Sequence, residues 1–482
     1  MTVKENKKMK HIRLLMTLTV LLLLQTGCKK DFLDQRPDLS QVVPKTLADC
    51  QALLDDYTRM NASYADHGEA ASDNYYFTDA VYDGLADVNN SPENKRNYSW
   101  HPQGEHVAQW LTGYQVVYNA NLVLSTLEKL SLEDSGYRAV RGSALFFRAF
   151  AFYHLAQLFC KPYTAATAGT DPGIPLRLRP DPTEVSSRGT VQQVYERITA
   201  DLLEAVSLLP VEVQVKSRPS KAAAYGALAR SYLSMEDYAE AGKMADECLK
   251  LQGTLIDYNA TSFSPTATTV GSDPSGASFA RFNAEVIFQS VTSYSSMEIE
   301  KTQIHPALYS SYGAKDRRRS VFFFEVTDWM GQPTGQVGFR GNYDGAYYGQ
   351  LYAAYFMGLA TDEMYLIRAE CQARAGNTVL AMQDLNILLS KRMEPPYVSR
   401  TAGSAHDALV QILAERRKEL VFRTLRWTDL RRLNKDPEFA VTLQRDMNNI
   451  PYTPLQPNDL RYTFLIPTRE VVDLTGIAQN PR

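Results

Sequence analysis

Apolar residues recur at helical spacing over much of the chain. Apolar positions three and four residues apart predict amphipathic helices. The predicted helical segments are Lys45 to Met60, Val107 to Leu130, Gly136 to Phe159, Val191 to Leu209, Lys221 to Leu251, Thr361 to Arg392 and His406 to Leu433. Strand patterns are few, and Glu285 to Val291 is the best of them. The pattern therefore predicts a mainly α fold with a little β structure.

Two of these helical blocks resemble each other at an offset of 140 residues. The matched pairs are Tyr225 and Tyr365, Ala229 and Ala369, Ala241 and Ala381, Ala245 and Leu385, and Cys248 and Leu388. The turn Met235-Glu236-Asp237 falls on Ala375-Gly376-Asn377. Small residues where two antiparallel helices cross allow a close approach. This arrangement predicts a scaffold of tetratricopeptide-like helical pairs, which must stack to bury their apolar faces.

Long segments without helical periodicity separate the predicted helices. They are Asn61 to His106, Tyr163 to Arg188, Asp257 to Phe279 and roughly Thr327 to Leu351, and they are rich in glycine, polar and aromatic residues. Loops of this length in a compact protein are usually functional or disordered. We therefore look for binding residues in these loops.

The N-terminus has the pattern of an export signal. Basic residues at 4, 7, 8, 10 and 13 precede an apolar run from Leu14 to Leu24, which at eleven residues is shorter than the roughly 20 needed to span a bilayer. The segment Leu24-Gln25-Thr26-Gly27-Cys28 resembles a bacterial lipoprotein signal. We expect residues 1–27 to be a signal peptide, Cys28 to be acylated, and residues 28–482 to form the mature domain. The alternative is a secretory signal followed by an incidental cysteine.

Composition excludes several classes of protein. The 482 residues are 44% hydrophobic, which is typical of a folded globular chain rather than a disordered or fibrous one. Lysine plus arginine number 51 against 54 for aspartate plus glutamate, so no basic surface for nucleic acid is predicted. Cys50, Cys160, Cys248 and Cys371 are widely spaced and have no metal-ligand pattern, which favours buried free thiols.

A series of motifs runs in order from Cys28 almost to the end of the chain. The motifs are Lys29-Lys30-Asp31-Phe32-Leu33-Asp34, Tyr118-Asn119-Ala120-Asn121, Arg141-Gly142-Ser143-Ala144-Leu145-Phe146-Phe147-Arg148-Ala149, Gly173-Ile174-Pro175-Leu176, Glu285-Val286-Ile287-Phe288, Glu363-Met364-Tyr365-Leu366-Ile367-Arg368-Ala369-Glu370, Glu415-Arg416-Arg417-Lys418-Glu419-Leu420, Arg426-Trp427-Thr428-Asp429-Leu430, Ile466-Pro467 and Gln479-Asn480-Pro481. Together they resemble the SusD/RagB family of Bacteroidetes lipoproteins. One departure is Phe422-Arg423-Thr424-Leu425-Arg426, where the family has Phe-Glu-Gly-x-Arg.

The resemblance implies a function without chemistry of its own. Such proteins are lipid-anchored at the outer membrane on the extracellular side, and they bind oligosaccharides, or peptides in some branches. They deliver the ligand to a SusC-type TonB-dependent transporter. The resemblance implies no cofactor and no catalytic residue. A peptide-binding uptake protein remains an alternative, as does a surface glycosidase, because sequence does not give the separation of a carboxylate pair.

The loop from Asn61 to His106 offers the first candidate binding residues. A sugar has apolar C–H faces edged by hydroxyls, so a sugar site needs aromatic rings beside polar groups. Residues of both kinds gather there: Asp73, Asn74, Tyr75, Tyr76, Asn97, Tyr98 and Trp100. Family members often place ligand contacts in the corresponding loop. We expect Trp100 to stand at the lip of the site and to stack on a sugar, with little effect on stability.

A second candidate cluster contains Trp329, Tyr343, Tyr347 and Tyr348. For both clusters the alternative is that the aromatic rings only pin long loops to the scaffold. Trp110 and Trp427 lie within helical patterns, so both are predicted to be core residues.

Catalytic and metal-binding patterns are absent from the sequence. His101 and His106 are five residues apart with Pro102 and Gly104 between them, which matches no established ligand spacing, and a solvated loop is expected instead. The chain contains no GxSxG, HExxH, Walker or GxGxxG motif. The glycines between 335 and 349 are not followed by the lysine that phosphate binding needs.

The lipid anchor is directly testable. Replacing Cys28 with alanine removes the expected acylation site, so the variant should lose metabolic labelling by a lipid precursor and be released from membranes. Cys50→Ala is the matched control and should keep the label. A Cys28→Ala variant that is still labelled and still bound to membranes would show that the anchor assignment is wrong.

Overall fold

The computed structural model describes residues 44–482, apart from 65, 86–92, 131–134, 182, 186, 261–278, 293–301, 329, 342, 344–354 and 449. The predicted signal peptide and Cys28 lie outside the described residues. No helix of the described part is long and apolar enough to cross a membrane.

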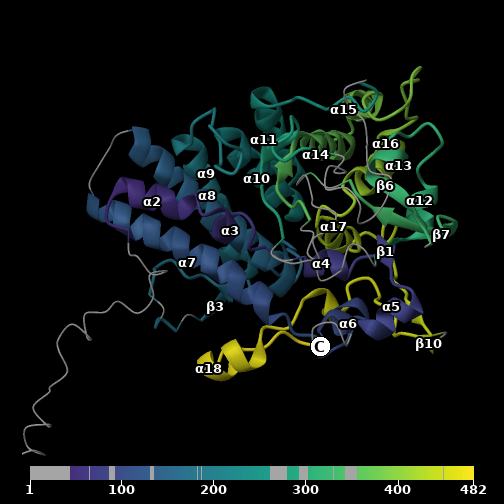
Figure 1. The fold of residues 1–482 in the computed structure, drawn as a ribbon. Coiled ribbons are helices and arrows are strands. Elements are labelled where there is room, and N and C mark those ends of the chain that lie inside the picture. The colour runs from purple at the N-terminus through teal and green to yellow at the C-terminus, as the bar shows by residue number, and fades with distance from the viewer. Residues whose placement is uncertain are drawn as a thin grey trace, which may run out of the picture. The chain divides into compact units, whose positions relative to one another are not determined.

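Helices form the larger part of the fold, as the periodicity predicts (Figure 1). The long helices are α7 (Val107–Leu130), α8 (Ser135–Phe159), α9 (Val191–Leu208), α10 (Lys221–Ser234), α11 (Tyr238–Leu251), α14 (Thr361–Arg374), α15 (Thr378–Ser390) and α16 (Ala405–Glu419). The shorter helices are α2 (Leu47–Leu54), α3 (Tyr57–Met60), α4 (His67–Ala70), α5 (Asp79–Gly84), α6 (Glu93–Tyr98), α12 (Pro306–Ser310), α13 (Arg318–Phe322), α17 (Arg426–Leu433) and α18 (Asp473–Thr475).

Capping residues divide several of the predicted segments. The segment from Lys45 to Met60 is two helices, because the Asp56 carboxylate accepts the Arg59 N–H and starts α3 anew. Within the segment from Lys221 to Leu251, Asp237 caps α11 in the same way, so this segment is a helical hairpin. The last segment breaks between α16 and α17, where Phe422 and Thr424 adopt left-handed backbone angles.

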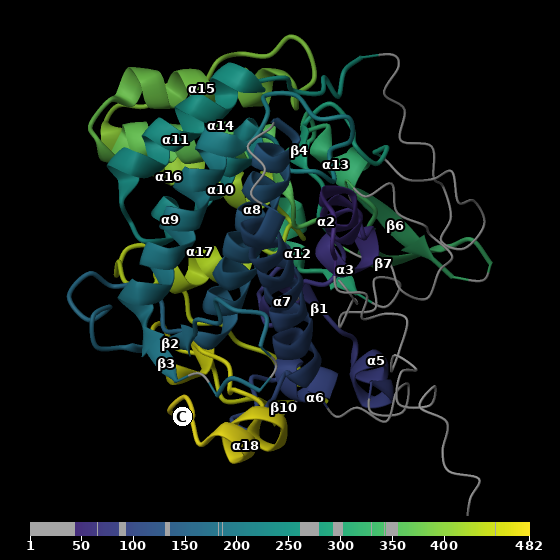
Figure 2. The same ribbon diagram turned by 90° about the vertical axis from the view of Figure 1, so that its left-hand side faces the viewer.

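The long helices pack side by side in chain order from α7 to α16, with α14 following α11 (Figure 2). The two matched blocks are the hairpins α10–α11 and α14–α15, and they join where α11 packs on α14. At this junction the backbones are so close that a Cβ on Gly242 would lie 2.9 Å from the Cβ of Cys371. The small residues of the matched positions are fully buried: Ala229, Ala369, Ala241, Ala381, Ala245 and Cys248. The predicted repeat is therefore confirmed.

The strands are short, and all of them pair antiparallel in twos. The pairs are β1 (Tyr75–Tyr76) with β5 (Gln303–Ile304), β2 (Pro172–Pro175) with β3 (Arg188–Thr190), β4 (Val286–Phe288) with β8 (Leu359–Ala360), β6 (Phe323–Thr327) with β7 (Pro333–Phe339), and β9 (Asp446–Met447) with β10 (Ile450–Pro451). The predicted strand from Glu285 to Val291 contains β4 and an isolated bridge at Val291.

The segment from Asn61 to His106 is more ordered than its sequence predicts. It contains α4, β1, α5 and α6, all too short to give a periodic pattern. Its aromatic residues Tyr75, Phe77, Tyr82 and Tyr98 belong to a buried cluster that is separate from the core of the helical scaffold. Burial of these four rings is consistent with the alternative that loop aromatics hold the loop in place, and the ligand-contact role of Tyr75 stays a prediction.

The close helix crossings give a stability prediction. Replacing Ala229 or Ala369 with leucine should lower the free energy of unfolding by roughly 1–3 kcal/mol, because a larger side chain overpacks a fully buried site. Thermal melts will measure the effect. The control is Ala239→Leu on the exposed side of α11, which should melt like the unsubstituted protein. Equal melting temperatures for all three variants would contradict the assigned helix register.

Candidate functional site

A cleft of about 700 Å³ lies where most of the first predicted cluster comes together. Asp73, Tyr75, Tyr76, Tyr98 and Trp100 line this cleft. Residues far away in the sequence complete it: His305 and Ala307 from α12 and its cap, Arg417 from α16, and residues 441–447 around β9. Its volume lies within the range that is usual for small-molecule sites.

The two tyrosines of β1 point in different directions, because side chains alternate along a strand. Tyr75 is buried, and its hydroxyl donates to the Ala70 carbonyl at 2.7 Å. Tyr76 is half-buried, and its hydroxyl makes no hydrogen bond to a described residue. Partial burial raises the pKa of Tyr76, so the hydroxyl stays protonated at neutral pH. Tyr76 is therefore the ring of the predicted cluster that is best placed to contact a ligand.

Trp100 does not stand at the lip of the cleft. Only 5% of the residue is exposed, and the indole N–H donates to the Ala71 carbonyl at 2.9 Å. Its backbone has φ +53°, a left-handed conformation that the surrounding packing must hold. The expectation of an exposed platform with little effect on stability is wrong. A ligand contact through the edge of the indole that lines the cleft remains a prediction.

Asp73 and Asn74 are held by protein groups. Arg426 contacts both carboxylate oxygens of Asp73, at 2.7 and 3.0 Å, and Arg417 contacts one of them at 3.0 Å. Burial alone would raise the pKa of Asp73, but the two guanidinium groups lower it well below its usual range. Asn74 is buried, and its amide donates to Glu69 at 2.8 Å. Both side chains already hold protein groups, and their role as ligand contacts stays a prediction.

Arg445 fixes the aromatic floor of the cleft, and sequence reasoning missed it. Its guanidinium lies 3.5 Å from the ring centroid of Tyr98, 4.8 Å from that of Trp100 and 5.3 Å from that of Tyr75. Nη1 donates to the Tyr98 carbonyl at 2.6 Å, and Nη2 donates to the Ser72 carbonyl. The residue stands in a C-terminal loop, far along the chain from these rings, and no local pattern marks it.

Arg417 is the other cationic residue that lines the cleft and was missed. A signal for it existed in the sequence, because Glu415 to Glu419 is a run of five charged residues within an amphipathic helix. Five consecutive residues cover more than one helical turn, so their side chains point to all sides of the helix and cannot all face solvent. In the structure Glu415 and Glu419 point into the protein, whereas Arg417 reaches the cleft.

Of the second predicted cluster only Tyr343 is described, and it does not line the cleft. Trp329, Tyr347 and Tyr348 lie outside the described residues. Tyr343 is buried, and its hydroxyl donates to Glu285 and, at 3.4 Å, to Asp362. The structure therefore places Tyr343 in a buried polar network, and its role as a ligand contact stays untested.

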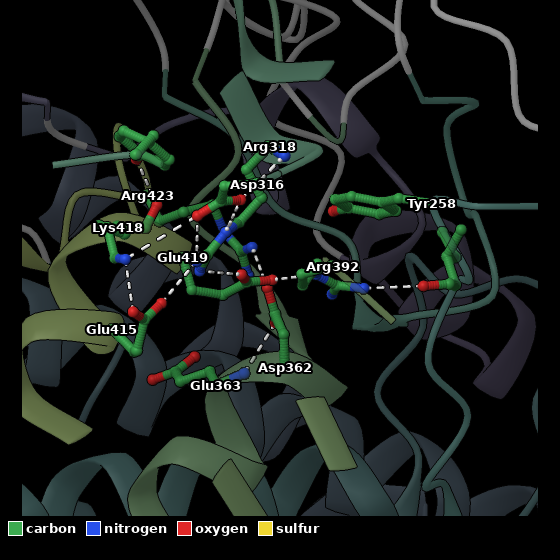
Figure 3. A network of polar contacts seen from close by, with 12 residues as sticks. Tyr258, Asp316, Arg318, Asp362, Glu363, Arg392, Glu415, Lys418, Glu419 and Arg423 are labelled. Atoms are coloured by element: carbon green, nitrogen blue, oxygen red, sulfur yellow. Dashed lines mark hydrogen bonds and ion pairs between the residues drawn. The ribbon is translucent and has the colours of Figure 1, made fainter. Parts of the chain in front are cut away.

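Figure 3 shows this network, which joins α16 to distant loops. Arg392 donates to Glu285 and to Glu419, both at 2.7 Å, and Arg318 donates to Glu419 at 3.0 Å and to Glu415 at 2.5 Å. All five residues are buried. Burial and neighbouring carboxylates raise the pKa of Glu285 to about 7, although Arg392 lowers it.

The histidines and the helical tryptophans have structural roles. His101 is exposed, but His106 is buried, with its ring centroid 4.3 Å from that of His67, so the expected solvated loop is wrong for His106. Within the described part of the chain, no cluster of His, Cys, Asp and Glu could hold a metal ion. Trp110 and Trp427 are buried core residues, as predicted.

Comparisons with known proteins cover most of the chain. Residues 31–233 match the family model described as "Starch-binding associating with outer membrane", and residues 345–482 match the model of the SusD family. The SusD-like protein P2 of Formosa agariphila is 27% identical over 481 aligned positions, which cover 86% of this chain and 90% of that protein.

Solved structures resemble the fold along nearly its whole length. A SusD superfamily protein from Bacteroides thetaiotaomicron has a TM-score of 0.70 at 21% identity, and the match covers 91% of this chain and all of the other. A SusD-like carbohydrate binding protein from Bacteroides vulgatus has a TM-score of 0.65 at 17% identity, covering 90% and 97% of the two chains. At these identities the likeness shows the fold alone.

The position of Tyr343 leads to a prediction that separates stability from binding. Tyr343→Phe removes a hydroxyl that donates to the buried carboxylate of Glu285 and lies 3.4 Å from that of Asp362, so the free energy of unfolding should fall by about 1–3 kcal/mol. Ligand affinity of the folded variant should not change, because Tyr343 does not line the cleft. Thermal melts and calorimetry on one preparation measure both quantities. An unchanged melting temperature together with weaker binding would show that Tyr343 contacts the ligand.

Proposed function

Because the chain belongs to the SusD/RagB family, we propose that it is a surface lipoprotein that binds oligosaccharides for nutrient uptake. The observation that carries the proposal is the cleft of about 700 Å³, in which the half-buried ring of Tyr76 stands beside side chains that can hydrogen-bond to hydroxyls. A ring of this kind can cover the apolar face of a sugar while polar neighbours bind its edge.

Two further observations support a carbohydrate ligand without catalysis. One family model is described as starch-binding, and a solved structure of the same fold is described as carbohydrate binding. In the cleft, Asp73 is paired with two arginines and its pKa is depressed, so it cannot act as a general acid. We therefore propose binding and release of an intact ligand.

The proposal includes location and transfer. Acylation at Cys28 would hold the protein at the outer membrane on the extracellular side, and a SusC-type TonB-dependent transporter would receive the ligand. The family assignment and the N-terminal pattern support both statements. Co-purification of the full chain with a transporter from detergent-solubilised outer membranes would test the partnership, and a protein that never co-purifies with one would count against it.

The binding role is tested with defined glycans. A panel of neutral and acidic oligosaccharides, with peptides of similar size, is titrated into the protein in a calorimeter. We expect at least one glycan to bind without being cleaved. Binding to peptides alone would favour peptide uptake, and release of shorter sugars would reveal a glycosidase.

Tyr76 provides the sharpest variant for this test. Tyr76→Ala should weaken the binding of the glycan by about 1–2 kcal/mol, or roughly tenfold in Kd, because the stacking surface is lost. The control is Tyr232→Ala on α10, which removes a ring that is likewise half-buried but does not line the cleft. Equal affinities for the two variants would contradict the placement of the site.

A further inference from the structure

One wall of the cleft presents nitrogen donors that the protein leaves unused. Arg417 donates through Nε to Asn74 at 3.4 Å and through Nη2 to Asp73, but its Nη1 makes no hydrogen bond to a described residue. The side chain is 29% exposed. Arg445 places Nη1 and Nη2 on backbone carbonyls and also makes a side-chain hydrogen bond with Tyr75, so it brings mainly its positive charge to the cleft. Both arginines line the cleft.

His305 adds a third donor to the same wall. Its Nδ1 accepts the N–H of Ala307 at 3.3 Å, so the hydrogen of the neutral ring is on Nε2. The residue is exposed and lies close enough to Asp73, Arg417 and Arg445 for their charges to act on it. Arginine has no acceptor atom, and this histidine tautomer already uses its own acceptor. The arginine and histidine side chains of the wall therefore offer donors only.

Positive charge exceeds negative charge at this wall. Among the charged side chains that line this wall, Arg417 and Arg445 stand with one carboxylate, that of Asp73. Two further acids, Asp66 and Glu69, are buried behind the wall. Burial raises the pKa of Glu69 to about 7, so it is only partly ionised at neutral pH. No described carboxylate pairs with Arg445, whose charge is met only by carbonyls and aromatic rings.

The remaining acids of the cleft lie on the side formed by α5 and β9. Asp79 and Asp446 are exposed, and Asp79 already accepts the backbone N–H of Asn448 at 2.9 Å. Solvent screens exposed charges of this kind. Free carboxylate oxygens there suit the hydroxyl groups of a sugar, which can donate hydrogen bonds.

We infer that the cleft binds an acidic glycan, whose carboxylate or sulfate group accepts hydrogen bonds from Arg417 and His305 and lies near the charge of Arg445. An acceptor-only anion matches the donors of Arg417 and His305, and charge-assisted hydrogen bonds are the stronger kind. Neutral sugar hydroxyls would leave the excess positive charge of the wall without a partner. The inference rests on the proposed function and specifies its substrate class.

Three matched tetrasaccharide probes test the inference: a neutral β-glucan, an oligouronate and a sulfated galactan. Each is titrated into the full chain at 50 mM and at 500 mM NaCl. One of the two acidic probes should bind at least tenfold more tightly than the neutral one at low salt. Its affinity should fall several-fold at high salt, whereas that of the neutral probe should not change. The acidic probe that binds shows whether the anion is a carboxylate or a sulfate.

Arg417→Gln should weaken binding of the acidic probe by at least tenfold. Arg197→Gln is a closely matched control. Like Arg417, Arg197 forms an ion pair with an aspartate, Asp201, and its side chain is 37% exposed. Asp201 also accepts two hydrogen bonds from a second arginine, Arg148, just as Asp73 does from Arg426. This control should not change the affinity for the acidic probe. Arg417→Lys keeps the charge and should recover part of the loss, which a merely structural role would not predict.

The outcomes separate the inference from the proposed function. Tight binding of the neutral probe, with no preference for either acidic one, would overturn the inference and leave carbohydrate binding intact. Salt-independent binding of an acidic probe, or an equal loss in Arg417→Gln and Arg197→Gln, would also overturn it. If no oligosaccharide in the wider panel bound, both statements would fall together.

Discussion

The buried ion network around Glu419 determines where the cleft can form. Arg318 and Arg392 are completely enclosed, and each bonds to Glu419 on α16. A charge buried without a partner is very costly, and removing one member of such a pair typically costs about 3–5 kcal/mol. The network therefore fixes the position and rotation of α16. Arg417, on the same helical turn, is directed to the cleft as a result.

The helical scaffold could be predicted from the sequence because its cause is local. Apolar periodicity gave α7 with the expected bounds and α8 and α9 to within one residue, and the offset of 140 residues identified the two hairpins. The errors came where the periodic signal is too short to see. Helices of four to six residues, such as α4 and α6, depend on packing against the rest of the protein, which no window of sequence reveals.

The candidate site was predictable in part. The mixture of tyrosines with an aspartate and an asparagine at 73–76 marked a segment that lines the cleft, since aromatic and polar residues gather there without a helical pattern. The exposure of Trp100 was misjudged because Arg445, far along the chain, packs against the indole. Arg445 and His305 could not be found by any local pattern, because only the tertiary fold brings them together.

The contacts that close the cleft have a consequence for how the protein is made. The hydrogen bond from Arg445 to Tyr98 spans 347 residues, and that from Arg426 to Asp73 spans 353. Contacts of such long range form late, because the entropy of closing the intervening chain must be met first. A chain that is still being synthesised has no cleft until Arg426 and Arg445 have been added. The cleft therefore forms only near the end of synthesis, and a chain terminated before Arg445 cannot complete its aromatic floor.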